Sequence, residues 1–123
     1  MSWVTDALLI LGLQECFDDD FEVVADIPSL AAINAWLEDH DFGTFDRLDE
    51  QVTGGGKAMQ ALVYGGAFNH LARNLDEFLR VVAAQPWRVP EEVQLLLKDE
   101  EEGRFGLFEI GRASCRERVS KQV

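Results

Sequence analysis

The sequence contains few cysteines, few histidines and few basic residues. Its 123 residues include two cysteines and two histidines, and 11 lysines and arginines stand against 23 aspartates and glutamates, for a formal charge of −12. Structural zinc sites need about four cysteine or histidine ligands, so we expect no zinc and no other bound metal or cofactor. Negative charge repels nucleic-acid backbones and anionic lipids, so we expect neither nucleic acid nor a membrane as a direct partner.

Long hydrophobic runs are absent as well. The apolar run Ala7 to Leu11 is far shorter than the ~20 residues that a transmembrane helix needs, and no basic residue precedes it as in a signal peptide. Cys115 lies in a C-terminal tail that is discussed next, which leaves Cys16 with no intrachain disulfide partner. These features predict a cytoplasmic protein.

The C-terminal tail has an unusual sequence. Residues 110–119, Ile-Gly-Arg-Ala-Ser-Cys-Arg-Glu-Arg-Val, fit the codons ATC GGA AGA GCG TCG TGT AGG GAA AGA GTG, which resemble one strand of a widely used short-read library adapter. We therefore interpret residues 110–123 as a non-native tail; the alternative is a basic tail that binds an anionic partner. The tail has four basic residues and one acidic residue, so residues 1–109 keep 7 basic and 22 acidic residues and a charge of −15.

The hydrophobic pattern of residues 1–109 predicts a single α+β domain. The predicted elements, in chain order, are a strand at 4–13, an extended segment at 21–24, a helix from Pro28 to about His40, a short strand at 43–48, a strand from Ala58 to Tyr64, a helix from Leu75 to before Pro86, and two strands at 93–98 and 104–108. This order favours an antiparallel or mixed four- to five-stranded sheet with two helices on one face, a ferredoxin-like (split βαβ) layout.

Local signals predict how the elements end. Gly65 and Gly66 indicate a bulge or a close backbone approach at the end of the strand that contains Tyr64. Asn74, followed three residues later by Glu77, indicates a capping box at the start of the second helix. In the last hairpin, Gly103 is the natural residue for a left-handed backbone conformation.

One glycine-rich segment partly resembles a phosphate-binding loop. In Gly54-Gly55-Gly56-Lys57, backbone amides and the lysine would surround phosphate groups. However, Ala58 stands where the motif needs a hydroxyl group, and Gln51 stands where it needs a glycine. We therefore interpret the segment as an ordinary hairpin turn.

A second segment partly fits a calcium-binding loop. Asp39, Asp41 and Glu50 occupy the first, third and twelfth positions of such a loop. Thr44, however, stands at the position of the required glycine, and Arg47 brings a positive charge to the ninth position. We therefore predict no dedicated metal site.

Three residues around the Gly65-Gly66 pair are low-ranking catalytic candidates. Tyr64, Asn69 and His70 would converge on a small pocket, with His70 as the general base. The alternative, which we favour, is that Asn69 and His70 form hydrogen bonds within the loop that leads to the second helix. Cys16 as a nucleophile is likewise less expected than Cys16 as an inert packing residue, and the three tryptophans are expected in the core or over sheet edges.

The acidity is the strongest functional signal. We predict a small acidic protein-binding module, such as an inhibitor or immunity-type protein that neutralises a basic, nucleic-acid-binding partner. The ordinary alternative for the charge is solubility, and the alternative function is a small enzyme or ligand-binding domain with a pocket near Tyr64 and His70. The carboxylates predicted to contact the partner are Asp18, Asp19, Asp20, Asp99, Glu100, Glu101 and Glu102.

Overall fold

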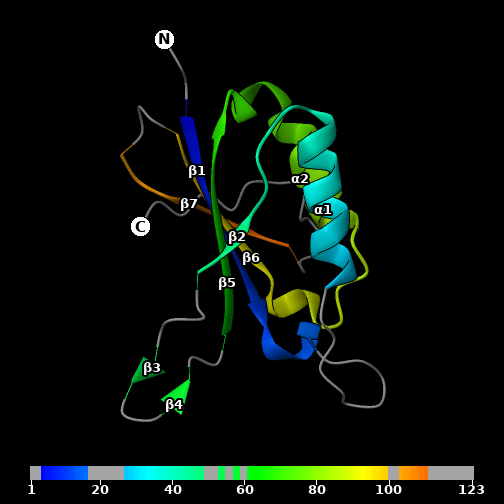
Figure 1. The fold of residues 1–123 in the computed structure, drawn as a ribbon, viewed down its shortest axis with the longest axis vertical. Coiled ribbons are helices and arrows are strands. Elements are labelled where there is room, and N and C mark those ends of the chain that lie inside the picture. Colours follow the sequence, from blue (N-terminus) through cyan, green and yellow to red (C-terminus); the bar gives the residue numbers. More distant parts are fainter. Residues whose placement is uncertain are drawn as a thin grey trace.

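The computed structural model describes residues 4–16, 27–48, 53–54, 57–58, 61–99 and 103–110. A five-stranded sheet forms one layer and two helices lie on one of its faces (Figure 1). The elements are β1 (Val4–Gly12), η1 (Leu13–Cys16), α1 (Pro28–Asp39), β2 (Asp46–Arg47), β3 (Thr53–Gly54), β4 (Lys57–Ala58), β5 (Ala61–Asn69), η3 (Leu71–Asn74), α2 (Leu75–Ala84), η4 (Pro90–Glu92), β6 (Gln94–Asp99) and β7 (Gly106–Glu109), where η denotes a 3-10 turn.

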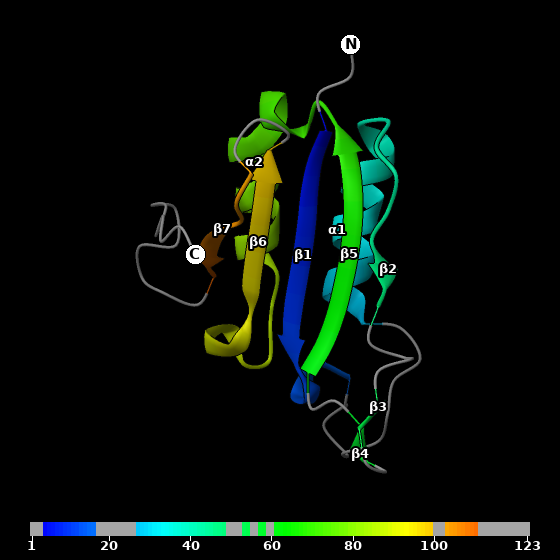
Figure 2. The ribbon, with the colours of Figure 1, turned by 90° about the vertical axis from the view of Figure 1, so that its left-hand side faces the viewer.

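The sheet has the strand order β2-β5-β1-β6-β7, and every neighbouring pair is antiparallel. Because β5 lies between β1 and β2, and β1 lies between β5 and β6, each helical connection passes over one intervening strand (Figure 2). The predicted α+β class and five-stranded sheet are confirmed. The ferredoxin-like layout is not confirmed in its exact form, because β2 has only two residues and β7 is an additional edge strand.

The central strand β1 follows the predicted alternation of buried and exposed residues. Thr5, Ala7, Leu9 and Leu11 are buried beneath the helices, whereas the residues between them point to the opposite face and are only partly buried. Successive side chains of a strand point to opposite faces, so this pattern covers one face of the sheet and leaves the other for a different environment. The strand predicted at 4–13 is confirmed.

The strand β5 is longer than the sequence pattern predicts. It runs through both glycines to Asn69 in an unbroken register with β1, with Gly65 opposite Leu8. The predicted strand end at the glycines is therefore wrong. Side chains instead lie close to the glycine positions: a Cβ atom on Gly65 would lie 2.6 Å from Leu48 Cδ1, and one on Gly66 would lie 2.5 Å from Phe68 Cζ.

The helix α1 begins with Pro28 in its first turn, as predicted, and ends in a Schellman motif. The N–H of Phe42 donates to the carbonyl of Leu37 (2.8 Å), and the N–H of Asp41 donates to the carbonyl of Glu38 (3.1 Å). Asp41 is the left-handed residue of the motif, with φ of 62°. The predicted helix end near His40 is confirmed, but Asp41 and not a glycine makes the turn.

The helix α2 follows η3 directly and has no side-chain cap. The predicted capping box is wrong, because Asn74 makes no capping hydrogen bond and the carboxylate of Glu77 instead meets a side chain of α1. The helix buries Phe78 and Val82 against the sheet. Trp87, which follows α2, is 6% exposed and donates its indole N–H to the carbonyl of Val82 (2.8 Å), so it is a core residue as expected.

The last hairpin is formed by β6 and β7, as predicted. Gly103 has φ of 68°, which confirms it as a left-handed position. Ile110, the first residue of the segment that the sequence assigns to the tail, is 4% exposed and belongs to the core cluster. Its N–H donates to the carbonyl of Val93 (3.4 Å), so the packed core includes the first residue after Glu109.

Candidate functional site

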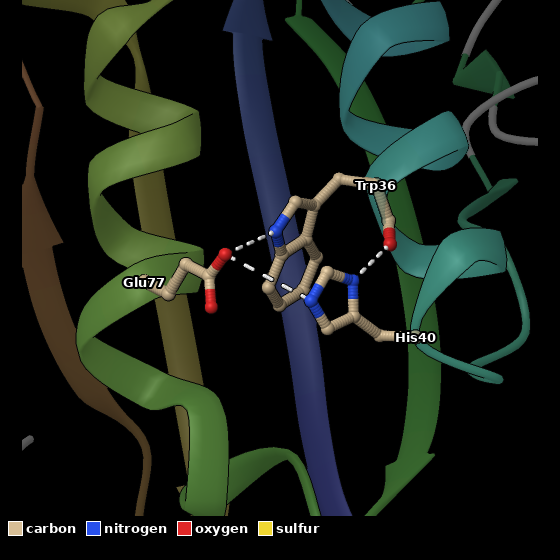
Figure 3. Close-up of polar contacts among 3 residues, drawn as sticks. All are labelled: Trp36, His40 and Glu77. Carbon is tan, nitrogen blue, oxygen red and sulfur yellow. Dashed lines mark hydrogen bonds and ion pairs between the residues drawn. The ribbon is translucent and has the colours of Figure 1, made fainter.

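A polar and aromatic cluster joins the C-terminal end of α1 to the first turn of α2 (Figure 3). The indole Nε1 of Trp36 donates a hydrogen bond to Glu77 Oε1 (3.2 Å), and His40 Nε2 lies 3.8 Å from the same oxygen. His40 Nδ1 lies 2.8 Å from the carbonyl oxygen of Trp36. Because a carbonyl only accepts, Nδ1 carries the proton in that contact. One carboxylate oxygen therefore faces both side chains of α1.

Aromatic contacts hold the two α1 side chains in place. The rings of Trp36 and His40 stack with their centroids 4.1 Å apart and an interplanar angle of 26°. The indole also packs against the rings of Phe42 and Phe78, with centroid distances of 6.0 Å and 5.7 Å. These two rings connect it to the hydrophobic core. Trp36 is itself half-buried. The indole is thus packed against three other rings and only partly exposed.

Several further carboxylates occupy the same two helix ends. Exposed acidic residues occur in the last turn of α1, in the turn after it and in the first turn of α2, and no basic residue lies in the last turn of α1. The C-terminus of a helix carries partial negative charge, so acidic side chains there lower the stability of the helix. Charged residues that lower the stability of the fold are typical of functional surfaces. We define the helix-end cluster as Trp36, Glu38, Asp39, His40, Asp41, Asp76 and Glu77.

A surface depression of about 510 Å³ adjoins the cluster. It is open and mainly polar, and η3 and the first part of α2 line it, including Glu77. Arg73 and Arg80 also line this depression, so the negative charge of the helix-end cluster is concentrated on its α1 side. The exposed carboxylates of this arrangement suit a cationic group, which they attract and can bind through charge-assisted hydrogen bonds.

The structure does not bring the three catalytic candidates together. Tyr64 is 7% exposed and lies on the face of β5 that the helices cover, whereas Asn69 is exposed on the opposite face of the same strand. His70 has φ of 62°, and its carbonyl accepts a hydrogen bond from the N–H of Arg73 (3.1 Å). His70 thus forms part of the turn into η3.

Most of the carboxylates predicted to bind a partner lie outside the described residues, namely Asp18, Asp19, Asp20, Glu100, Glu101 and Glu102. Asp99 is described and is half-buried. Its Oδ1 accepts a hydrogen bond from the hydroxyl of Thr5 (2.7 Å), which is buried in the sheet. Asp99 therefore contributes to the pairing of β1 with β6.

The two incomplete motifs adopt ordinary local structures. Thr53–Gly54 and Lys57–Ala58 pair as the antiparallel strands β3 and β4, as expected for a hairpin. In the partial calcium motif, Asp39 ends α1 and Asp41 lies in the following turn, whereas Glu50 lies outside the described residues. Among the described residues, no group of three or more histidine, cysteine or acidic side chains could hold a metal ion.

Cys16 is a free cysteine that is half-buried in η1. Its thiol donates a hydrogen bond to the carbonyl of Leu13 (3.0 Å) and packs against the core. Such a contact is the behaviour of a packing residue.

Fold and site together define a two-layer α+β domain with an acidic, aromatic cluster at one end of its helical layer. No protein-family model, no curated protein and no solved structure matches the chain. None of the helices in the described ranges is long and apolar enough to cross a membrane.

Sequence reasoning missed the helix-end cluster although it noticed some of its members. Asp39 and Asp41 were interpreted only as candidate calcium ligands, and Glu77 only as a capping residue. The available signal was the closeness of Trp36 and His40 to a run of carboxylates. The contact with Glu77 had no such signal, since 41 residues separate it from Trp36.

Proposed function

We propose that the chain is a small acidic protein-binding module that neutralises a basic, nucleic-acid-binding partner, in the manner of an inhibitor or immunity protein. The observation that carries this proposal is the helix-end cluster, in which the Trp36 indole donates a hydrogen bond to Glu77 and further exposed carboxylates occupy the same helix ends. Interfaces are typically anchored by a few aromatic residues within a polar rim. The cluster has this composition.

Two physical effects support binding of a basic partner. The formal charge of −12 accelerates the approach of a positively charged protein by electrostatic steering. After the encounter, a lysine or arginine of the partner would pair with Asp39 or Asp41. We propose the cytoplasm as the compartment, because one free cysteine in the domain suits reducing conditions.

Inhibition of basic nucleases tests this proposal. The full chain is mixed with a set of basic nucleases, and nuclease activity and complex formation are measured over a series of salt concentrations. We expect inhibition at low salt that weakens as salt rises, because screening reduces steered association. A set of basic nucleases that all remain active and unbound at low salt would show the proposal to be wrong.

Matched charge variants separate the helix-end cluster from general acidity. The double variant Glu38→Gln and Asp39→Asn removes two exposed carboxylates at the end of α1. The control Glu91→Gln and Glu92→Gln removes two exposed carboxylates in η4. We expect the first variant to slow association roughly threefold to tenfold and the control to change it much less. Equal losses would assign the effect to net charge alone.

A further inference from the structure

The sheet face opposite the helices carries an aliphatic surface that no described helix covers (Figure 2). The register aligns Leu8 of β1 with Leu96 of β6, and Leu96 with Leu107 of β7. In the neighbouring row, Ile10 of β1 lies opposite Val63 of β5. The first aliphatic row spans β1, β6 and β7, and the second spans β5 and β1. When one face of an antiparallel sheet is in contact with water, the residues on that face are normally polar. This face has more aliphatic residues than solvent exposure alone explains.

Leu48 completes this surface at the β2 edge. Its N–H donates to the carbonyl of Val63 (2.8 Å), which extends the pairing of β2 with β5 by one residue. Its side chain lies over Gly65 and is 48% exposed, which makes it the most exposed large hydrophobic side chain in the described part of the chain. We define the outer sheet face by Leu8, Ile10, Leu48, Val63, Leu96 and Leu107.

Carboxylates border the outer sheet face. Asp46 lies at the β2 edge opposite Gly65, and Glu109 lies on β7 opposite Gln94. Asp6 lies on β1, where its Oδ2 is 3.7 Å from Lys98 Nζ. That lysine also lies 5.6 Å from the centre of the Phe105 ring. Asp6 and Asp46 thus set two carboxylates against the one lysine, Lys98, that the described strands place on this face.

We propose that the outer sheet face is a second protein-docking surface, and that its occupant is a protein surface with an aliphatic centre and lysine or arginine residues at its margin. Charge complementarity selects this occupant. A second copy of the chain would bring the same carboxylates and a charge of −12 against this margin, whereas a basic margin would face Asp6 and Asp46 with opposite charge. The surface lies opposite the helix-end cluster, so the two surfaces can act independently.

A designed peptide with the proposed chemistry tests this inference. The probe is an amphipathic helical peptide of about 14 residues with a leucine stripe flanked by lysines. One control peptide has glutamate in place of lysine, and another has alanine in place of leucine. Binding to the full chain is followed by backbone amide chemical shifts. We expect shifts along β1, β5 and β6 with the leucine–lysine peptide and at least tenfold weaker binding of both controls.

Variants of the outer sheet face and of the helix-end cluster show which surface binds the peptide. Leu48→Asp changes a half-exposed side chain, so we expect folding to be preserved, which circular dichroism checks. The variant should weaken binding of the leucine–lysine peptide at least tenfold. Leu48→Ala is a smaller change and should weaken peptide binding less, and Trp36→Ala should leave peptide binding unchanged. Three outcomes would each overturn the inference. The chemical-shift changes could be confined to α1 and α2, or the leucine–glutamate peptide could bind equally well. The third is a dimer of the chain, detected by sedimentation, that Leu48→Asp dissociates. None of these outcomes decides whether the helix-end cluster inhibits nucleases.

Discussion

Glu77 accepts a hydrogen bond from the indole of Trp36 at 3.2 Å, and this bond links the start of α2 to the end of α1. The two residues are 41 positions apart in the chain. The same carboxylate oxygen lies 3.8 Å from His40 Nε2, so a single side chain of α2 organises both the aromatic and the acidic part of the helix-end cluster. Helix packing and the proposed partner contact therefore depend on one interaction.

Replacing the indole tests how much this bond contributes to stability. Trp36→Phe keeps an aromatic ring above Phe78 but removes the donor, so we expect the free energy of unfolding to fall by roughly 0.5–1 kcal/mol, at the low end for a neutral donor at an exposed site. Trp36→Ala also removes the ring contacts and should cost about 2 kcal/mol. Urea denaturation measures both. Identical stability of Trp36→Phe and the parent chain would show that the hydrogen bond contributes nothing.

A second prediction concerns the left-handed residue that ends α1. Asp41 has φ of 62°, a conformation that costs a residue with a Cβ atom roughly 1 kcal/mol relative to glycine. Asp41→Gly should therefore raise the free energy of unfolding by up to about 1 kcal/mol, and it also removes a negative charge from a helix C-terminus. Asp39→Gly, inside the last helical turn, removes the same charge and should lower stability. A destabilised Asp41→Gly variant would contradict this assignment.

The end of α1 also shows what the sequence could and could not predict. Apolar spacing and Pro28 predict the helix and its length, because both are local signals. The same local signals did not identify Asp41 as the residue that makes the turn. The reason is the Schellman geometry, in which the hydrogen bond from Phe42 to Leu37 brings Phe42 against Trp36. That packing depends on the tertiary structure.

The strand β5 shows the same limit for a sheet. Gly65 and Gly66 look like a strand end when only β5 is considered, since glycine weakens strands. In the structure, the neighbouring strand β1 pairs with β5 along its whole length. Cross-strand pairing between residues about 60 positions apart outweighs local propensity. The outer sheet face was missed for the same reason, because only the register shows that Leu8, Leu96 and Leu107 share a face.

The two glycines of β5 should respond differently to a methyl group. In Gly66→Ala the new Cβ would approach the ring of Phe68, which is 1% exposed and packs at 5.3 Å against the ring of Phe45. This ring has little room to move, so we expect a loss of about 1–3 kcal/mol. In Gly65→Ala the new Cβ meets the exposed end of Leu48, which can rotate away, and the loss should be smaller. Comparing the two melting temperatures checks the prediction, and a reversed order would contradict it.

A buried carboxylate in η1 gives a fourth prediction. Glu15 is 5% exposed, and its two oxygens accept the backbone N–H groups of Arg88 (3.1 Å) and Val89 (2.9 Å). Glu15→Ala leaves both donors without this acceptor, so the free energy of unfolding should fall by about 2–3 kcal/mol. Glu15→Gln retains one acceptor oxygen and should lose less. Chemical denaturation of both variants makes the comparison, and equal losses would mean that the hydrogen bonds are not the cause.

The last prediction concerns where the folded domain ends. Residues 111–123 continue the sequence that resembles an adapter, whereas Ile110, although it belongs to the same codon match, is buried in the core beside Val93. A chain that ends after Ile110 should keep the stability of the full chain. A chain that ends after Glu109 loses one buried isoleucine and should be less stable by roughly 1.5–3 kcal/mol. A third chain, with Ile110→Val and no residues beyond it, should fall between them, because valine retains most of the buried surface. Thermal unfolding of the three chains separates the packing of one side chain from any effect of the tail.

A large loss of stability on removing residues 111–123 alone would show that the tail is part of the fold, and would remove the support for treating it as non-native.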